Sequence, residues 1–188
     1  MDLTHKQRML AGEPYFAGDP EIVADARRAM LLTERYNATS VDDGELRRSL
    51  LEDLLGSVGE GVELRPPFRC DFGFNINIGA RSFANFDLIV LDVARVDIGE
   101  DAWIGPGVQI LTATHPVEPG PRRAKVEGAR PIALGANVWL GGGAIVLPGV
   151  TIGDDTVIGA GAVVTRDLPA GVVAVGNPAR IVREIQPT

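Results

Sequence analysis

The sequence predicts a mainly β protein, in which short parallel strands form a stack of three-sided coils behind an α-helical N-terminal segment. The first observation behind this prediction is an aliphatic residue that recurs every six residues over much of the chain. The second is the composition, which combines 23 glycines and 13 prolines with only 5% aromatic residues. That balance is unusual for an ordinary packed core and indicates a repeat architecture.

The six-residue repeat is clearest between residues 98 and 164. Its aliphatic positions are Ile98, Ile104, Ile110, Leu134, Leu140, Val146, Ile152, Ile158 and Val164. Glycine follows most of them, and a small or β-branched residue comes four positions later. Neither an α-helix, with about 3.6 residues per turn, nor a simple strand has this period. A flat strand that ends at a corner, and is then repeated, has a period of six residues. Three such sides give a coil of 18 residues, and coils stack about 4.8 Å apart.

A coil of this length predicts which positions lie on one another. Leu134 should pair with Ile152, and Trp103 should stand two 18-residue coils before Trp139. Small residues at one position of successive coils should form a column, which comprises Gly142, Ala160 and Pro178.

Two stretches depart from the repeat. An earlier series, from Ile78 to Val96, is two residues out of step with Ile98, so we expect a bulge or a longer corner between Val90 and Ile98. The pattern is then lost among prolines, glycines and basic residues, which predicts a projecting loop at about 115–131.

Residues 1–57 are expected to form the helical segment. Asp19-Pro20-Glu21 is typical of an N-cap followed by proline in the first turn of a helix. Apolar residues at helical spacing follow, namely Ile22, Ala26, Met30 and Leu31. A second helix is expected from Asp43 to Leu55, with Leu46, Leu50, Leu51 and Leu54. The coils should occupy 58–175, and 176–188 should form a short cap over the last coil.

Composition excludes several classes of protein. No apolar run reaches the roughly 18 residues that cross a bilayer, and residues 1–8 lack the apolar centre of a secretory signal, so we expect a cytoplasmic protein without membrane contact. A formal net charge of -7 argues against general nucleic-acid binding. The single cysteine, Cys70, excludes an internal disulfide and a cysteine-built zinc site.

Several motifs occur in order along the chain. They are Met9-Leu10-Ala11-Gly12-Glu13, Ala84-Asn85-Phe86, Thr112-Ala113-Thr114-His115-Pro116, Val138-Trp139-Leu140-Gly141-Gly142-Gly143, Pro148-Gly149-Val150-Thr151-Ile152-Gly153 and Gly176-Asn177-Pro178-Ala179-Arg180. With this series the chain resembles the hexapeptide-repeat acetyltransferases of the maltose, galactoside and nodulation-factor type over nearly its whole length. The resemblance implies a left-handed parallel β-helix, assembled as a homotrimer with active sites between subunits. It also implies transfer of an acetyl group from acetyl-CoA to a sugar hydroxyl, with no metal required.

The resemblance also suggests the catalytic side chains. His115 matches the family's general base, which would take the acceptor's proton as its hydroxyl attacks the thioester. The other histidine, His5, lies in a polar stretch and is expected to be solvated. Asn85 would donate a hydrogen bond to the acceptor or to the oxyanion. Glu127 would orient the histidine ring, as a glutamate in this region does in related enzymes, or it is simply an exposed charge.

On the donor side, Gly142 matches the position whose backbone N–H stabilises the oxyanion. The column of Gly142, Ala160 and Pro178 would leave a groove for the pantetheine arm, with Trp139 beside it. Cations would contact the phosphates, since the guanidinium group suits phosphate. The residues that match nucleotide contacts in relatives are Thr165, Arg166, Arg180 and Arg183.

Acceptor contacts are predicted on two kinds of side chain. Carboxylates would bind sugar hydroxyls, and the candidates are Asp71, Asp92 and Asp19. Phe83 and Trp103 would give the acceptor an apolar face, or would pack at the seam between subunits. The chain departs from the galactoside enzyme at Val93 and near Ala17, where that enzyme has aspartates, and a galactoside preference is therefore in doubt.

Other interpretations keep the coils but change the chemistry. The same fold could acetylate the amine of an amino sugar or the hydroxyl of an antibiotic. A non-catalytic trimeric scaffold would give no reason for His115 and Asn85 to be present together. A γ-class carbonic anhydrase needs three zinc-binding histidines, and this chain has two. Cys70 has no partner base nearby in the sequence and is interpreted as a packed or partly exposed thiol rather than a nucleophile.

Overall fold

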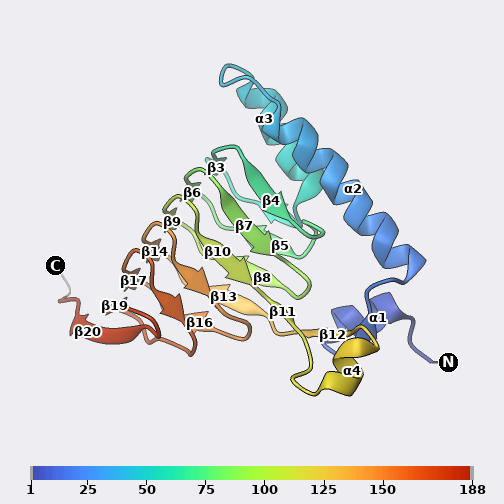
Figure 1. Cartoon of the computed structure of the whole chain (residues 1–188). Coiled ribbons are helices and arrows are strands. Elements are labelled where there is room, and N and C mark those ends of the chain that lie inside the picture. The colour runs from blue at the N-terminus through green and yellow to red at the C-terminus, as the bar shows by residue number, and fades with distance from the viewer. Residues whose placement is uncertain (1, 187–188) are drawn as a thin grey trace.

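The computed structural model describes residues 2–186, which form a stack of coils with three flat faces, as the sequence predicts (Figure 1). The first face consists of β2 (Ser57–Val58), β5 (Ile76–Ile78), β8 (Val96–Ile98), β13 (Ile132–Leu134) and β16 (Thr151–Ile152). The second consists of β3 (Glu63–Leu64), β6 (Phe83–Ala84), β9 (Trp103–Ile104), β14 (Trp139–Leu140), β17 (Val157–Ile158), β19 (Val172–Val175) and β20 (Arg180–Glu184). The third consists of β4 (Phe68–Cys70), β7 (Leu88–Leu91), β10 (Gln109–Leu111), β15 (Ile145–Val146) and β18 (Val163–Val164).

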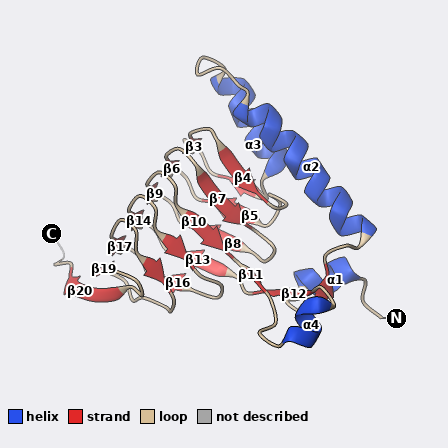
Figure 2. Cartoon of the chain, viewed as in Figure 1, coloured by secondary structure: helices blue, strands red, loops and turns tan. Residues whose placement is uncertain are grey.

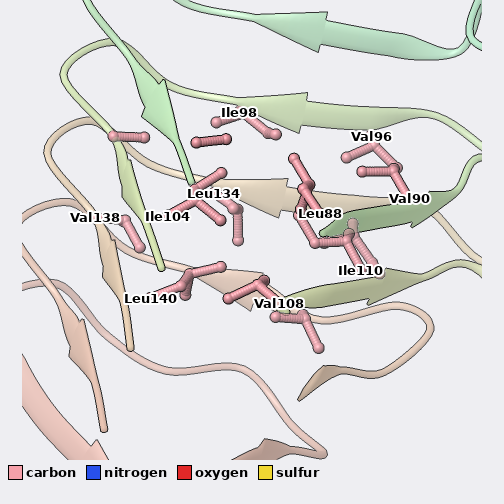
Figure 3. Close-up of a cluster of buried hydrophobic side chains, with 14 of the residues drawn as sticks. Leu88, Val90, Val96, Ile98, Ile104, Val108, Ile110, Leu134, Val138 and Leu140 are labelled. Carbon is pink, nitrogen blue, oxygen red and sulfur yellow. The ribbon is translucent and has the colours of Figure 1, made fainter. Parts of the chain in front are cut away.

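The six-residue repeat places the core. All nine aliphatic positions of the repeat are buried, and so are most of the small or β-branched residues four positions after them, such as Ala102 and Val138. Figure 3 shows these side chains pointing inward from the three faces, where they fill the centre of the coils. Aliphatic packing inside a narrow coil leaves little room for rings, which explains the low aromatic content.

Neighbouring coils do not all have one length. Leu134 pairs with Ile152, at the predicted step of 18 residues. In the earlier coils the step is 20, since Ile78 pairs with Ile98. The two additional residues lie in the corner between Val90 and Ile98, where the sequence predicts a longer corner.

Two predicted stacking relations are wrong. Trp103 pairs directly with Trp139 in the next coil, because the residues between them form one coil and the projecting segment rather than two coils. The column at Gly142 continues to Ala160, where the N–H of Gly161 donates to the Gly142 carbonyl at 2.9 Å. It does not continue to Pro178 at the same step, because Ile158 pairs with Ala174, only 16 residues further on.

The N-terminal segment contains α1 (His5–Leu10), β1 (Tyr15–Phe16), α2 (Pro20–Asn37) and α3 (Gly44–Leu54). Helix α2 begins as predicted, with Asp19 Oδ1 accepting from the Glu21 N–H at 3.0 Å. Its buried face is formed by Ile22, Ala29 and Tyr36. Met30 and Leu31 are exposed, as is Leu46 on α3, although their spacing is helical. They lie next to the buried stripe in sequence but project from another side of the helix.

Helices α2 and α3 cover the first coil of the stack (Figure 2). Asn37, at the end of α2, completes the edge of β4: its Nδ2 donates to the Phe68 carbonyl at 2.9 Å, and its Oδ1 accepts from the Phe68 N–H at 2.8 Å. One side-chain amide thus supplies the bonds that a preceding strand would give.

The segment expected as a loop at 115–131 has structure of its own. β11 (Ala113–Thr114) and β12 (Val126–Ala129) form an antiparallel pair, and the short helix α4 (Pro119–Arg123) lies between them. We call residues 113–129 the arm. It lies beside α1 in Figure 1, because β12 also pairs with β1 of the N-terminal segment.

At the other end of the stack, β20 folds back on β19 as an antiparallel strand. This hairpin lies where a terminal cap is expected. Within residues 2–186, no helix has the length and apolar character that crossing a membrane requires.

Candidate active site

The arm carries both His115 and Glu127. The β11–β12 register pairs Ala113 with Ala129 and Thr114 with Gly128. His115 directly follows β11, and extending that register by one residue sets it opposite Glu127. Residues directly opposite in an antiparallel pair have side chains on one side of the sheet, with Cβ atoms about 5 Å apart. His115 is exposed and Glu127 is half-buried, so this register would set a solvent-accessible imidazole across from a partly desolvated carboxylate.

Tyr15 contacts the same carboxylate from the other side. It pairs with Glu127 in the β1–β12 register, and its hydroxyl donates to Glu127 Oε2 at 2.8 Å. Burial, followed by the hydrogen bond to Glu127, raises the pKa of Tyr15 far above its ordinary value. The hydroxyl therefore remains protonated and acts as a donor.

The segment after His115 is held by Arg122. Its Nη1 donates to the carbonyl of Pro116 at 3.1 Å and to that of Val117 at 2.6 Å. Neither Arg122 nor Tyr15 was assigned a role in the site from the sequence. No local signal marks them: Tyr15 is 112 positions from its partner, and Arg122 is one of several basic residues in the segment.

The three predicted carboxylates have different environments. Asp71 is half-buried near Glu127, and burial, followed by the charges of Asp92 and Glu127, raises its pKa to about 6. Asp92 is fully buried and accepts from the N–H groups of Asp71, Phe72 and Asn75 at 2.9–3.3 Å.

Asp92 is therefore a structural anchor for residues 71–75, and its contact with an acceptor stays a prediction. The Asp19 carboxylate also has a structural partner, because its Oδ1 accepts from the Glu21 N–H and caps α2. Of the three, only Asp71 has no hydrogen-bond partner for its side chain among the described residues.

A second group of predicted residues lies at another corner. Asn85 follows β6 at the corner between the second and third faces, and its Oδ1 accepts from the Phe86 N–H at 2.9 Å. Gly142 follows β14 at the same corner. Its N–H has no acceptor within residues 2–186, so it is free to donate to a ligand.

Aromatic side chains line the second face next to this corner. Phe83, Trp103 and Trp139 occupy paired positions in three successive coils. The rings of Phe83 and Trp103 are 5.6 Å apart, and the two tryptophans are 56% and 54% exposed. A cavity of about 1240 Å³ lies between Trp103, Trp139 and the terminal residues 184–186, with Asn137 and Asp155 in its lining.

The predicted phosphate contacts are all exposed but do not line that cavity. Thr165 and Arg166 follow β18, while Arg180 and Arg183 belong to β20. Arg180 donates to the carbonyl of Ala179 at 2.9 Å. These four residues therefore lie near the last coils, and their role in nucleotide binding stays a prediction.

The predicted site thus falls into two parts. The histidine edge is the corner between the third and first faces, with Tyr15, Asp71, His115 and Glu127. The glycine edge is the corner between the second and third faces, with Asn85 and Gly142. A width of about six residues, or roughly 20 Å, separates the two edges within one chain.

No cluster suited to a metal ion interrupts this arrangement: the described part of the chain contains no group of three or more histidine, cysteine, aspartate or glutamate side chains able to hold one. Cys70 is half-buried, and burial raises the pKa of its thiol above the ordinary value. That thiol is a poor nucleophile, in agreement with its interpretation as a packing residue.

Comparisons with known proteins give the family. Residues 8–59 match the maltose acetyltransferase hexapeptide capping motif, and residues 131–166 match the bacterial transferase hexapeptide repeats. Nodulation protein L of Rhizobium meliloti is 54% identical over 181 residues, which are 96% of this chain and 99% of that protein.

Solved structures agree with these sequence matches. The maltose O-acetyltransferase of Clostridium difficile 630 superposes with a TM-score of 0.97 at 44% identity, over 98% of this chain and 99% of that one. A hexapeptide-repeat acetyltransferase of Vibrio cholerae, crystallised with acetyl-coenzyme A, has a TM-score of 0.91 at 36% identity, over 98% and 100% of the two chains.

Coils, capping segment and arm together define a parallel β-helix acyltransferase. More particularly, the chain belongs to the hexapeptide-repeat acetyltransferases of the maltose, galactoside and nodulation-protein type.

Proposed function

We propose that this protein transfers an acetyl group from acetyl-CoA to a hydroxyl of a sugar or a related small polyol. The observation that supports it best is the register of the arm, which, extended by one residue, sets the exposed His115 opposite the half-buried Glu127 in a chain of this family. The transfer is direct, within a ternary complex, because no nucleophilic side chain is needed and Cys70 is not activated.

His115 acts as the general base in this reaction. Its imidazole takes the proton of the acceptor hydroxyl while the oxygen attacks the carbonyl carbon of the thioester. Asn85 and the free N–H of Gly142 stabilise the negative charge that forms on the carbonyl oxygen. When the C–S bond breaks, the imidazolium returns its proton to the thiolate sulfur. The products are the acetyl ester and free CoA, so protons and electrons balance.

A homotrimer completes the site. The histidine edge and the glycine edge are roughly 20 Å apart within one chain, too far for His115 and Gly142 to act on one bond. Placing the histidine edge of one chain against the glycine edge of its neighbour brings them together, and a cyclic trimer does so three times. Exposed Trp103 and Trp139 next to the glycine edge suit such a contact.

The donor extends along the glycine edge toward the last coils. Gly142 and Ala160 give a path without large side chains, and Trp139 borders it. At its end, Thr165, Arg166, Arg180 and Arg183 bind the nucleotide phosphates.

Acceptor selectivity comes from Asp71 near the histidine edge and from Phe83 and Trp103 on the apolar side. Val93 and Ala17 offer no carboxylate, which argues against a galactoside as the preferred acceptor.

The test is a thiol-release assay with acetyl-CoA and a panel of monosaccharides, disaccharides, amino sugars and chloramphenicol-like alcohols. His115→Ala should lose turnover by about a thousandfold or more while calorimetry shows unchanged CoA binding. Retained turnover in this variant would exclude His115 as the base.

Acetylation of an amino-sugar amine is the second candidate function, favoured by the acidic surroundings of Asp71. The two reactions give different products, because alkaline hydroxylamine cleaves an acetyl ester and leaves an amide intact. An acetylated product that survives this treatment would replace O-transfer by N-transfer.

A further inference from the structure

Glu127 is held between strands from distant parts of the chain. β12 pairs with β1 on one side, which brings Tyr15 opposite Glu127, and with β11 on the other, whose register reaches Thr114 opposite Gly128, one residue before His115. The N-terminal segment therefore reaches the predicted catalytic pair, although it contributes no strand to the three faces of the coil.

Tyr15 is built into the structure as a fixed donor. Its side chain is 3% exposed and packs in an apolar cluster separate from the coil core. The other buried members of that cluster are Met9, Ile22, Phe72, Val93 and Ala129. The phenol ring cannot turn away in such packing, so its hydroxyl stays directed at Glu127 Oε2, 2.8 Å away.

The strand that carries Tyr15 is itself anchored. His5 Nδ1 accepts from the N–H of Phe16 at 3.2 Å, and the imidazole packs edge-on against the Phe16 ring. The expectation that His5 is merely solvated is therefore incomplete: it holds β1 to α1.

We infer that Tyr15 is a positioning residue for the acetyl transfer, acting through Glu127 on His115. Its hydroxyl fixes one carboxylate oxygen, which restricts the rotamers of Glu127 and leaves the other oxygen free for the imidazole. Tyr15 touches neither donor nor acceptor in this scheme. The inference rests on the proposed role of His115 and adds the N-terminal segment to the catalytic machinery.

Tyr15→Phe tests the inference, because it removes the hydroxyl and keeps the ring in its apolar cluster. We expect kcat to fall about tenfold, with KM for acetyl-CoA and for the acceptor changed less than about twofold. If Tyr15 had only a structural role, its substitution would lower the melting temperature without lowering kcat at nearly constant KM. Wild-type kcat, measured below the melting temperature of the variant, would overturn the inference.

A double-mutant cycle shows whether Tyr15 acts through Glu127. Glu127→Gln, Tyr15→Phe and the double variant are compared with the parent enzyme. If the two residues act as one unit, kcat of the double variant should equal that of Glu127→Gln within about twofold. Fully additive losses would mean that Tyr15 acts by another route, and they would overturn the inference.

The chain offers a matched control in its other tyrosine, Tyr36. This residue is also buried, and its hydroxyl donates from α2 to the Leu64 carbonyl in β3 of the first coil. Tyr36→Phe should lower the melting temperature but leave kcat unchanged. A fall in kcat equal to that of Tyr15→Phe would assign the effect to general loosening and overturn the inference.

Failure of the inference is distinct from failure of the proposed function. An inactive His115→Ala variant together with a fully active Tyr15→Phe variant leaves the base assignment intact and removes only the role of Tyr15. An active His115→Ala variant removes both.

Discussion

The two edges of the third face are built in different ways. The glycine edge is made by the repeat itself, with small residues and a free backbone N–H at a corner that recurs in each coil. The histidine edge is made by departures from the repeat, namely the corner at 71–75 that Asp92 anchors, the arm and β1. The comparison teaches that the repeat provides shape and backbone donors, whereas titratable side chains come from segments added to it.

The largest effect should come from separating the two edges onto different chains. His115→Ala and Asn85→Ala chains, each nearly inactive alone, should recover activity when they are refolded together. Each site would take His115 from one chain and Asn85 from its neighbour. In an equal random mixture each of these chains carries the intact residue with a probability of about one half, so about one site in four has both edges intact. Turnover of the mixture, compared with the separate variants, gives the answer. No recovery would place both edges of a site in one chain.

The backbone character of the glycine edge can be tested at neighbouring glycines. A Cβ on Gly141 would lie 2.5 Å from the Ala160 nitrogen, whereas on Gly142 its nearest neighbours are atoms of Pro106 at 3.4 Å. Gly141→Ala should therefore lower the free energy of unfolding by about 3 kcal/mol. Gly142→Ala should cost less than about 1 kcal/mol. Thermal and urea unfolding measure both, and equal losses would contradict this account of the corner.

The contribution of the histidine edge to folding stability should depend on pH, because Asp71 titrates there. Folding raises the pKa of Asp71 to about 6 from 3.8, so the folded state binds this proton more tightly than the unfolded chain does. The stabilising effect of protonation is complete below pH 3.8 and is lost as the pH rises through 6. Asp71→Asn should therefore stabilise the protein at pH 8 by about 1–2 kcal/mol after solvent screening, relative to its effect at pH 4. Melting temperatures at the two pH values test this, and a larger gain at pH 4 would reverse the sign.

The smallest effect is expected in the arm. Arg122→Ala removes the two bonds to the carbonyls of Pro116 and Val117, and should lower kcat about threefold because the segment after His115 loses its anchor. Arg123→Ala is the control, since Arg123 is an equally exposed neighbour and makes no such bonds in the described part of the chain. Equal rates for the two variants would show that the arm does not need the anchor.

Much of the coil could be predicted from the sequence, because each strand obeys a local rule. A six-residue period fixes which side chains point inward, and the shift at Ile98 revealed the longer corner. The pairing of Trp103 with Trp139 could not be predicted in the same way. The number of residues between them does not say how many belong to a coil and how many to the arm.

The histidine edge was predictable only in part. His115 and Glu127 were proposed from the family resemblance, but their pairing depends on the antiparallel turn of the arm, and Tyr15 enters through a contact across 112 positions. The structural contacts of Asp92 could not be predicted for a related reason. A carboxylate in a loop resembles a ligand contact in the sequence, and only the backbone conformation of residues 71–75 shows that its oxygens are already occupied.

Asn37 and β20 together have a consequence for the length of the particle. The terminal strands of a parallel ladder have unpaired backbone groups that can pair with a further copy, and fibres grow by this addition. Here the side-chain amide of Asn37 occupies the backbone groups of Phe68 at the start of the ladder, and the helices cover the first coil. At the other end, β20 is antiparallel to β19, so the second face does not end in a strand that continues the parallel ladder. The protein is thereby kept as a discrete body of fixed height, and association is directed to its sides.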